Sequence, residues 1–319
     1  MSLLEVKDLQ IAFKNKKNKN KPIEVIDNVS FSLEDDEILG IVGESGCGKT
    51  TLSRGILKVI NHRSGNIIID GKPIEEISRG EMSEKIQMIF QNPLASFNPR
   101  YTIKHSLYET ARVHKIKQVD FKKELQQLYE YTGLTEEMAS KYPGQLSGGQ
   151  LQRFAIVRAL IVKPKIIIAD EAVAALDVSI QTDILNLLLY LRKKLHIAIL
   201  FISHDLRVVK NICDRVLVMY LGTVFEFGNT QKIFDHPLHP YTRLLLASRT
   251  KSDPGEIKKE TFKFEDIPSI LDLPEGCRFG LRCEYAKENG CICEKQPLSK
   301  VEDGHYIACN HYEENEIQV

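Results

Sequence analysis

A glycine-rich loop near the N-terminus has the residue types and the spacing of a phosphate-binding site. Residues 43–50 read GESGCGKT and match the pattern G-x-x-x-x-G-K-[ST]. In such a loop, backbone N–H groups point at phosphate oxygens, Lys49 adds positive charge for the β- and γ-phosphates, and the Thr50 hydroxyl can bind Mg²⁺. The sequence therefore predicts a nucleoside triphosphate site formed by Gly43, Glu44, Ser45, Gly46, Cys47, Gly48, Lys49, Thr50 and Thr51.

Two carboxylates follow an apolar run that is typical of a buried strand. The run is Ile166–Ala169, and Asp170 and Glu171 come directly after it. Because open α/β sheets bind ligands at the carboxyl ends of their strands, we expect both side chains at a binding edge. Asp170 suits Mg²⁺, and Glu171 suits a base that orients or deprotonates the water attacking a phosphoryl group. Together with the glycine-rich loop, this pair predicts a nucleoside triphosphatase.

A second anion-binding segment reads LSGGQ at residues 146–150. A serine and two glycines that open a helix direct backbone N–H groups at an anion. Two phosphate cradles in one chain are explained if two chains pair head to tail, each segment closing on the nucleotide of the other chain. The order and spacing of these motifs resemble those of ATP-binding cassette (ABC) proteins, and the segment contributes Ser147, Gly148, Gly149 and Gln150.

The ABC resemblance implies ATP as the nucleotide and gives roles to further residues. Gln91 matches the Q-loop glutamine, which reaches Mg²⁺ and water, and His204 matches the switch histidine, which contacts the γ-phosphate. Asp177 matches the D-loop aspartate, and Phe13 stands where the family places an aromatic ring that stacks on adenine. Ala174 replaces the usual D-loop serine and removes one hydroxyl near the dimer interface. The implied catalytic residues are Glu171, His204, Gln91 and Lys49, and the implied Mg²⁺ ligands are Thr50, Gln91 and Asp170.

Finer features resemble one subfamily of ABC transporters, the oligopeptide/dipeptide/nickel importers, and its F-type rather than its D-type ATPase subunit. They are the phosphate loop with its following TLSR, the stretch 92–100 (NPLASFNPR), residues 218–222 (VMYLG) and residues 236–246. This resemblance implies a second ABC ATPase subunit, D-type in a heterodimer, two transmembrane permease subunits and an extracytoplasmic solute-binding protein. It places the chain peripherally on the cytoplasmic face of the cell membrane. Dipeptides, oligopeptides, nickel chelates and other metallophores stay open as cargo.

Cysteine use is uneven along the chain, because five of the seven cysteines lie between positions 277 and 309. The N-terminus alternates apolar and charged residues and does not read as a secretory signal, so this cluster favours a metal site over disulfides. The subfamily resemblance implies a four-cysteine extension that holds a 4Fe–4S cluster. Thiolates in fours equally suit tetrahedral Zn²⁺. The implied ligands are Cys277, Cys283, Cys291 and Cys309, with Cys293 as the alternative to Cys291.

Apolar runs that alternate with helical patterns predict an α/β fold with a parallel sheet core. Alternating residues at 3–13 and 23–33 predict an antiparallel β subdomain, and residues from about 92 to 160 a helical subdomain. The alternation of strand-like and helix-like segments ends near residue 245. We therefore expect an ABC ATP-binding domain over 1–245 and a C-terminal extension over 246–319.

Charge and composition argue against other classes of protein. The 319 residues include 43 Lys plus Arg and 43 Asp plus Glu, so no nucleic-acid partner held by bulk charge is expected. The most apolar stretch, 184–203, is interrupted by Arg192, Lys193, Lys194 and His196, so we expect no membrane span. A soluble ABC ATPase acting on ribosomes or DNA lacks support, because the chain has neither a second phosphate loop nor room for a long coiled coil. A metal-regulated binding module is a third possibility.

Overall fold

The computed structural model describes residues 2–15, 22–248, 268–283, 285–286 and 291–310. The chain divides into two compact units. Unit 1 contains Met1–Leu4, Leu33–Ile38 and Ile69–Ser203, and unit 2 contains Glu5–Ser32, Leu39–Ile68 and His204–Val319.

Unit 1 is built on three parallel strands, β6 (Ile86–Ile89), β7 (Ile166–Asp170) and β8 (Ala198–Ile202), with β7 in the middle. Every residue of β7 and β8 is buried, which explains why β8, and β7 up to its final Asp170, read as apolar runs. The parallel register pairs Asp170 with Ile202, so the carboxyl ends of these two strands lie at one edge of the sheet.

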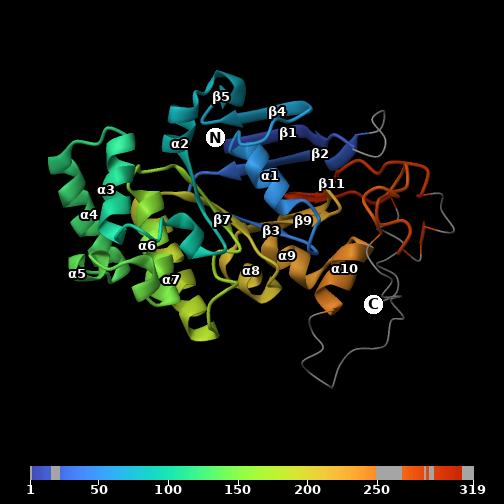
Figure 1. The fold of residues 1–319 in the computed structure, drawn as a ribbon. Helices are drawn as coiled ribbons and strands as arrows, with labels where there is room; N and C mark the ends of the chain where they lie inside the picture. The colour runs from blue at the N-terminus through green and yellow to red at the C-terminus, as the bar shows by residue number, and fades with distance from the viewer. Residues whose placement is uncertain (1, 16–21, 249–267, 284, 287–290, 311–319) are drawn as a thin grey trace. The chain divides into compact units, whose positions relative to one another are not determined.

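Helices make up most of the rest of unit 1. α6 (Gly148–Leu160) contacts α3 (Ile103–Val113), α4 (Gln118–Thr132) and β6, and these helices lie together in green in Figure 1. Phe154 of α6 is fully buried and meets the ring of Tyr129 edge to face. The remaining elements of unit 1 are β5 (Lys72–Pro73), η1 (Ile74–Glu76), α2 (Arg79–Lys85), η2 (Pro93–Ser96), α5 (Glu136–Ala139), η3 (Pro143–Gln145) and α7 (Val178–Leu195).

Unit 2 contains strands of two sheets. In the first, β1 (Ser2–Phe13) lies between β2 (Ile23–Glu34) and β4 (Ser64–Ile69). In the second, β3 (Ile38–Val42) runs parallel to β9 (Arg215–Tyr220), and β9 pairs antiparallel with β10 (Thr223–Asn229). The helices of unit 2 are α1 (Lys49–Ile56), α8 (Leu206–Ile212), α9 (Thr230–Asp235) and α10 (Pro240–Ala247).

The C-terminal residues continue the second sheet of unit 2. β12 (His305–Ile307) pairs antiparallel with β10, and β11 (Ser299–Glu302) pairs with β12. Glu226 of β10 is fully buried, and its carboxylate lies 2.8 Å from His305 Nε2 and accepts the backbone N–H groups of Leu238 and His239 at 3.0 Å. Because a buried carboxylate needs such partners, Glu226 links β10 to β12 and to the two residues that precede α10. The sequence did not predict these two strands.

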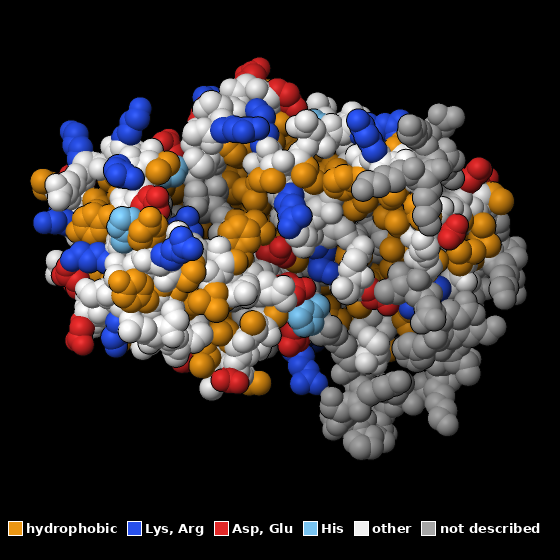
Figure 2. Space-filling model, viewed as in Figure 1, with side chains coloured by type: hydrophobic (Ala, Val, Ile, Leu, Met, Phe, Trp, Pro, Cys, Tyr) orange, Lys and Arg blue, Asp and Glu red, His pale blue; other side chains and the backbone are white. Residues whose placement is uncertain are grey.

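No helix within the described part of the chain is long and apolar enough to cross a bilayer. On the face shown in Figure 2, Lys and Arg side chains are dispersed, with Asp and Glu among them. This surface agrees with the equal numbers of basic and acidic residues.

Candidate nucleotide site and cysteine cluster

The glycine-rich loop lies where the sequence predicts it, between the buried strand β3 and the helix α1 of unit 2. Gly48 caps α1 in the left-handed region with φ 104°, and Gly43 has φ 154°. A Cβ on Gly43 would lie 2.1 Å from the carbonyl oxygen of Met219. Only glycine therefore allows both the loop conformation and its close approach to β9.

The loop holds the lysine that the motif predicts. Lys49 is 7% exposed, and its Nζ donates hydrogen bonds to the carbonyl oxygens of Gly43 at 2.8 Å and Glu44 at 3.0 Å. Burial raises the pKa of the neighbouring Cys47 thiol, and Lys49 opposes that rise. Ser45 and Thr50 are exposed, so the outer side of the loop is open to a ligand.

Two side chains predicted from separate motifs are in contact in unit 1. Gln91 Nε2 donates a hydrogen bond to Glu171 Oε2 at 2.8 Å. Glu171 directly follows β7, has φ 48°, and donates its backbone N–H to Ile202 at 2.9 Å. Asp170 ends β7 with 9% exposure. The edge of this sheet therefore gathers two carboxylates and an amide, a donor set suited to Mg²⁺ and to a water molecule.

The LSGGQ segment forms the N-terminus of α6. Ser147 caps the helix by accepting the N–H of Gln150 at 3.3 Å, and the Gln150 side chain accepts the N–H of Ser147 at 3.1 Å. Ser147 and Gly148 are exposed, whereas a Cβ on Gly149 would lie 2.8 Å from Ile180 Cγ2. The helix thus presents an uncovered N-terminus, as an anion-binding segment requires.

The other predicted nucleotide contacts are exposed. Asp177 precedes α7 as its N-cap residue, and His204 precedes the N-cap residue of α8, Asp205. Phe13 ends β1 with 43% of its surface exposed. The glycine-rich loop, Phe13 and His204 belong to unit 2, and Gln91, Asp170, Glu171, Asp177 and the LSGGQ segment belong to unit 1.

Four of the five C-terminal cysteines line one small pocket in unit 2, together with Phe279, Ala286 and other residues. They are Cys277, Cys283, Cys291 and Cys309. Cys293 is exposed and is absent from the residues that line this pocket. Burial raises the pKa of Cys277 to about 12 and that of Cys283 to about 11, and neighbouring thiols add to both rises.

The donor set fits a metal group in identity and number, because four thiols line one small pocket. Neutral thiols are expected there without a metal, since a cation is what favours the thiolate. No group of three or more His, Cys, Asp or Glu side chains among the described residues is arranged to hold a single metal ion.

Residues from the C-terminal part of unit 2 also contact the glycine-rich loop, which the sequence analysis did not predict. Tyr241 of α10 accepts the backbone N–H of Glu44 at 3.0 Å, and Arg282 forms an ion pair with the Glu44 carboxylate. The one available signal was the pair of arginines beside cysteines in CRFGLRC at residues 277–283.

Comparison with known proteins agrees with these features. The family model described as ABC transporter matches residues 26–174, and the model described as oligopeptide/dipeptide transporter, C-terminal region, matches residues 225–291. Among solved structures, cbiO1 of Clostridium perfringens has a TM-score of 0.65 at 28% identity and covers 74% of this chain and 91% of its own. The dimeric cassette MJ0796 bound to ADP and Pi has a TM-score of 0.61 at 25% identity, with 71% and 98% covered.

The fold and its motifs define an ATP-binding cassette, which confirms the predicted fold class. The chain is 41% identical to the oligopeptide transport ATP-binding protein OppF of Haemophilus influenzae, with 96% of each chain covered. It is 40% identical to OppF of Escherichia coli, with 96% of this chain and 95% of the relative covered. The di/tripeptide transport ATP-binding protein DppF of Pseudomonas aeruginosa is 40% identical over 92% and 91%. The chain belongs to the family of ABC transporter ATP-binding proteins that includes these subunits, and members of this family are ATPases.

Proposed function

We propose that the chain is the ATP-hydrolysing subunit of a membrane ABC importer for peptides. The Gln91–Glu171 contact carries this proposal, because it assembles a base and its orienting amide at the strand end where phosphoryl chemistry takes place. The similarity to oligopeptide and di/tripeptide transport subunits over nearly the whole chain supports peptides as cargo. Nickel and metallophores, which the sequence left open, are the alternative cargo.

The residues of the chain divide the work of hydrolysis. Phe13 stacks on adenine, and the N–H groups of residues 43–51 and Lys49 bind the phosphates. Thr50, Gln91 and Asp170 would hold Mg²⁺, which neutralises charge on the β- and γ-phosphates when bound. Glu171 accepts a proton from water as the oxygen attacks the γ-phosphorus, the bond to the bridging oxygen breaks, and ADP leaves. His204 contacts the γ-phosphate.

We infer that the site is completed by a second cassette. The exposed N-terminus of α6 supports this inference. In a head-to-tail dimer, this terminus would bind the nucleotide held by the phosphate loop of the partner, through Ser147, Gly148, Gly149 and Gln150. Asp177 lies at the same interface. The F-type features support a D-type partner, and the family supports two permease subunits, a solute-binding protein and a peripheral place on the cytoplasmic membrane face.

For the C-terminal region we propose a 4Fe–4S cluster held by Cys277, Cys283, Cys291 and Cys309, with Zn²⁺ as the alternative. Their position around one pocket, with Cys293 outside it, supports this ligand set. When bound, the cluster would supply a structural cross-link. We keep the division into an ATP-binding domain over 1–245, with its helical subdomain at about 92–160, and an extension over 246–319.

The function is tested by purifying the tagged chain in mild detergent from the native membrane. We expect a peptide-type permease pair and a second cassette to co-purify, and ATP turnover of the complex to rise with the loaded solute-binding protein. Co-purification with ribosomes or DNA, and no permease, would contradict the proposal and support a soluble ABC ATPase.

A further inference from the structure

One acidic residue of the phosphate loop is bound by an arginine from the cysteine-rich segment. Arg282 directs both terminal nitrogens at Glu44, with Nη1 to Oε2 at 2.9 Å and Nη2 to Oε1 at 3.3 Å. The residues are 238 positions apart in the chain. Such a two-point contact fixes the orientation of a carboxylate as well as its position.

The arginine is enclosed on its other sides. Its side chain is 5% exposed, its guanidinium lies over the rings of Tyr220 and Phe279, and Nη1 donates to the Tyr220 hydroxyl at 3.2 Å. A guanidinium this deeply buried requires an anionic partner. The Glu44 side chain is 26% exposed and supplies that charge at the margin of the loop.

The backbone of Glu44 connects this ion pair to the phosphate-binding lysine. Its N–H donates to the Tyr241 hydroxyl at 3.0 Å, and its carbonyl oxygen accepts from Lys49 Nζ at 3.0 Å. Glu44 is therefore held at three points, two of them on residues from the C-terminal half of unit 2. A shift of Glu44 would move the carbonyl that positions the Lys49 ammonium.

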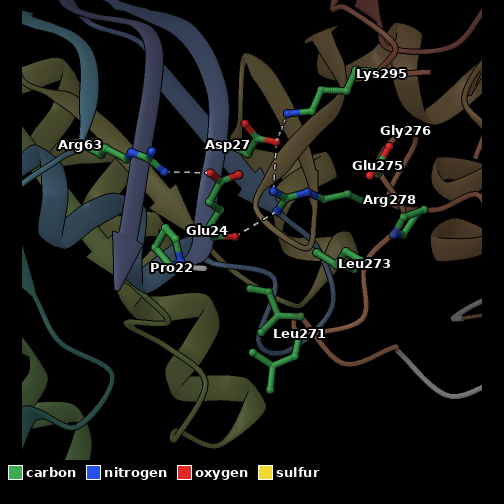
Figure 3. Close-up of a pocket in the computed structure, with 12 residues that line it drawn as sticks. Pro22, Glu24, Asp27, Arg63, Leu271, Leu273, Glu275, Gly276, Arg278 and Lys295 are labelled. Carbon is green, nitrogen blue, oxygen red and sulfur yellow. Dashed lines mark hydrogen bonds and ion pairs between the residues drawn. The ribbon is translucent and has the colours of Figure 1, made fainter. Parts of the chain in front are cut away.

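A second arginine of the same segment reaches the loop by another route. Arg278 is 8% exposed at its side chain, donates to Asp27 at 3.0 Å and also donates to the Leu221 carbonyl. Figure 3 shows Arg278 and Lys295 directed at Asp27. Gly222, which follows Leu221, donates its N–H to the carbonyl oxygen of Cys47 in the phosphate loop at 2.8 Å. The segment between Cys277 and Cys283 thus supports the loop from two sides.

We propose that Arg282 is a positioning residue for ATP binding, by which the cysteine-rich segment holds the phosphate loop in its binding conformation through Glu44. This inference rests on the proposed nucleotide role of that loop. Because Arg282 directly precedes Cys283, the cysteine-rich segment would then contribute to ATP binding as well as to its own fold.

The test compares full-length variants by their Kd for MgATP, measured by equilibrium titration with a fluorescent ATP analogue and by competition with ATP, and by the KM and kcat of the assembled transporter. We expect Arg282→Ala to raise the Kd and the KM on the order of tenfold, with kcat at saturating ATP nearly unchanged. Arg282→Lys should restore part of the affinity, because it keeps one charged donor.

A double-variant cycle and a matched control separate positioning from general damage. Once Glu44→Gln has weakened binding, adding Arg282→Ala should change the Kd by less than twofold. Lys232→Ala removes an exposed ion pair with Glu302 that does not contact the loop or its supports, and should leave the Kd at the parental value. An unchanged Kd in Arg282→Ala, strict additivity with Glu44→Gln, or an equal rise in Lys232→Ala would overturn the inference. If the parental chain itself binds no MgATP, the proposed function fails instead.

Discussion

The side-chain amide of Gln91 donates to the Glu171 carboxylate across 2.8 Å, although the two residues come from different motifs 80 positions apart. Glu171 has φ 48°, a conformation that non-glycine residues adopt uncommonly, and its N–H is bound by Ile202. Strain of this kind is kept where the surrounding structure fixes it, and it is found at functional sites. The Glu171 backbone conformation and the Gln91 amide together orient the Glu171 carboxylate. A substitution at Glu171 therefore tests its proposed role as the base.

Glu171→Gln should abolish ATP turnover without weakening ATP binding. The introduced amide has nearly the same shape but cannot accept a proton, so we expect kcat to fall by about 10² to 10⁴ while the Kd for MgATP changes less than twofold. Size-exclusion chromatography with MgATP should show a trapped dimer. ATP turnover by Glu171→Gln at the parental rate would show that Glu171 is not the base.

The signature segment can be tested against a helix cap of the same kind. Ser147→Ala should cost about 1 kcal/mol of stability through loss of the N-cap, and so should Thr102→Ala, whose hydroxyl caps α3 by accepting the His105 N–H at 3.2 Å. Only Ser147→Ala should also lower ATP turnover, because that terminus is the one we propose to bind a nucleotide across the dimer. Both are measured by thermal unfolding and by ATPase assay, and equal loss of turnover in the two variants would refute a signature role.

Acid should weaken a bridge in unit 1 that is centred on Asp70. Hydrogen bonds from Lys165 and Lys85, both at 2.8 Å, lower the pKa of this carboxyl from 3.8 to about 2. A carboxyl whose pKa is lower in the folded chain stabilises it above the unfolded pKa, so this contribution is present above about pH 4 and is lost as the pH falls through about 2. Because Asp70 is partly exposed, we expect less than about 1 kcal/mol.

Asp70→Asn isolates that charge, because asparagine also accepts the φ of 54° at this turn. The difference in unfolding free energy between parent and variant should be constant near pH 7, decrease as the pH falls below about 4 and disappear only below about pH 2. Urea unfolding at a series of pH values measures it. A difference that does not decrease between pH 7 and pH 2 would show that the pair with the lysines is not its source.

Local patterns sufficed for elements whose shape depends on neighbouring residues. The strand–loop–helix at Gly43–Thr50 and the buried strand before Asp170 follow from glycine placement and apolar runs. The contacts of Glu44 with Arg282 and of Glu226 with His305 join residues 238 and 79 positions apart, and no short pattern encodes them. A lone glutamate in the apolar strand 223–229 was the single signal that a buried partner existed.

The sequence left open whether Cys291 or Cys293 is the third cysteine ligand. The different positions of the two side chains in the structure allow a direct experiment. Cys291→Ser should remove the absorption and the bound iron of anaerobically purified protein, because this thiol lines the pocket shared with Cys277, Cys283 and Cys309. Cys293→Ser is the matched control, two positions away and exposed, and should keep both. Metal analysis of the two variants also separates iron from zinc. Full metal content in Cys291→Ser together with loss in Cys293→Ser would reverse the assignment, and metal-free, active parental protein would exclude a metal group altogether.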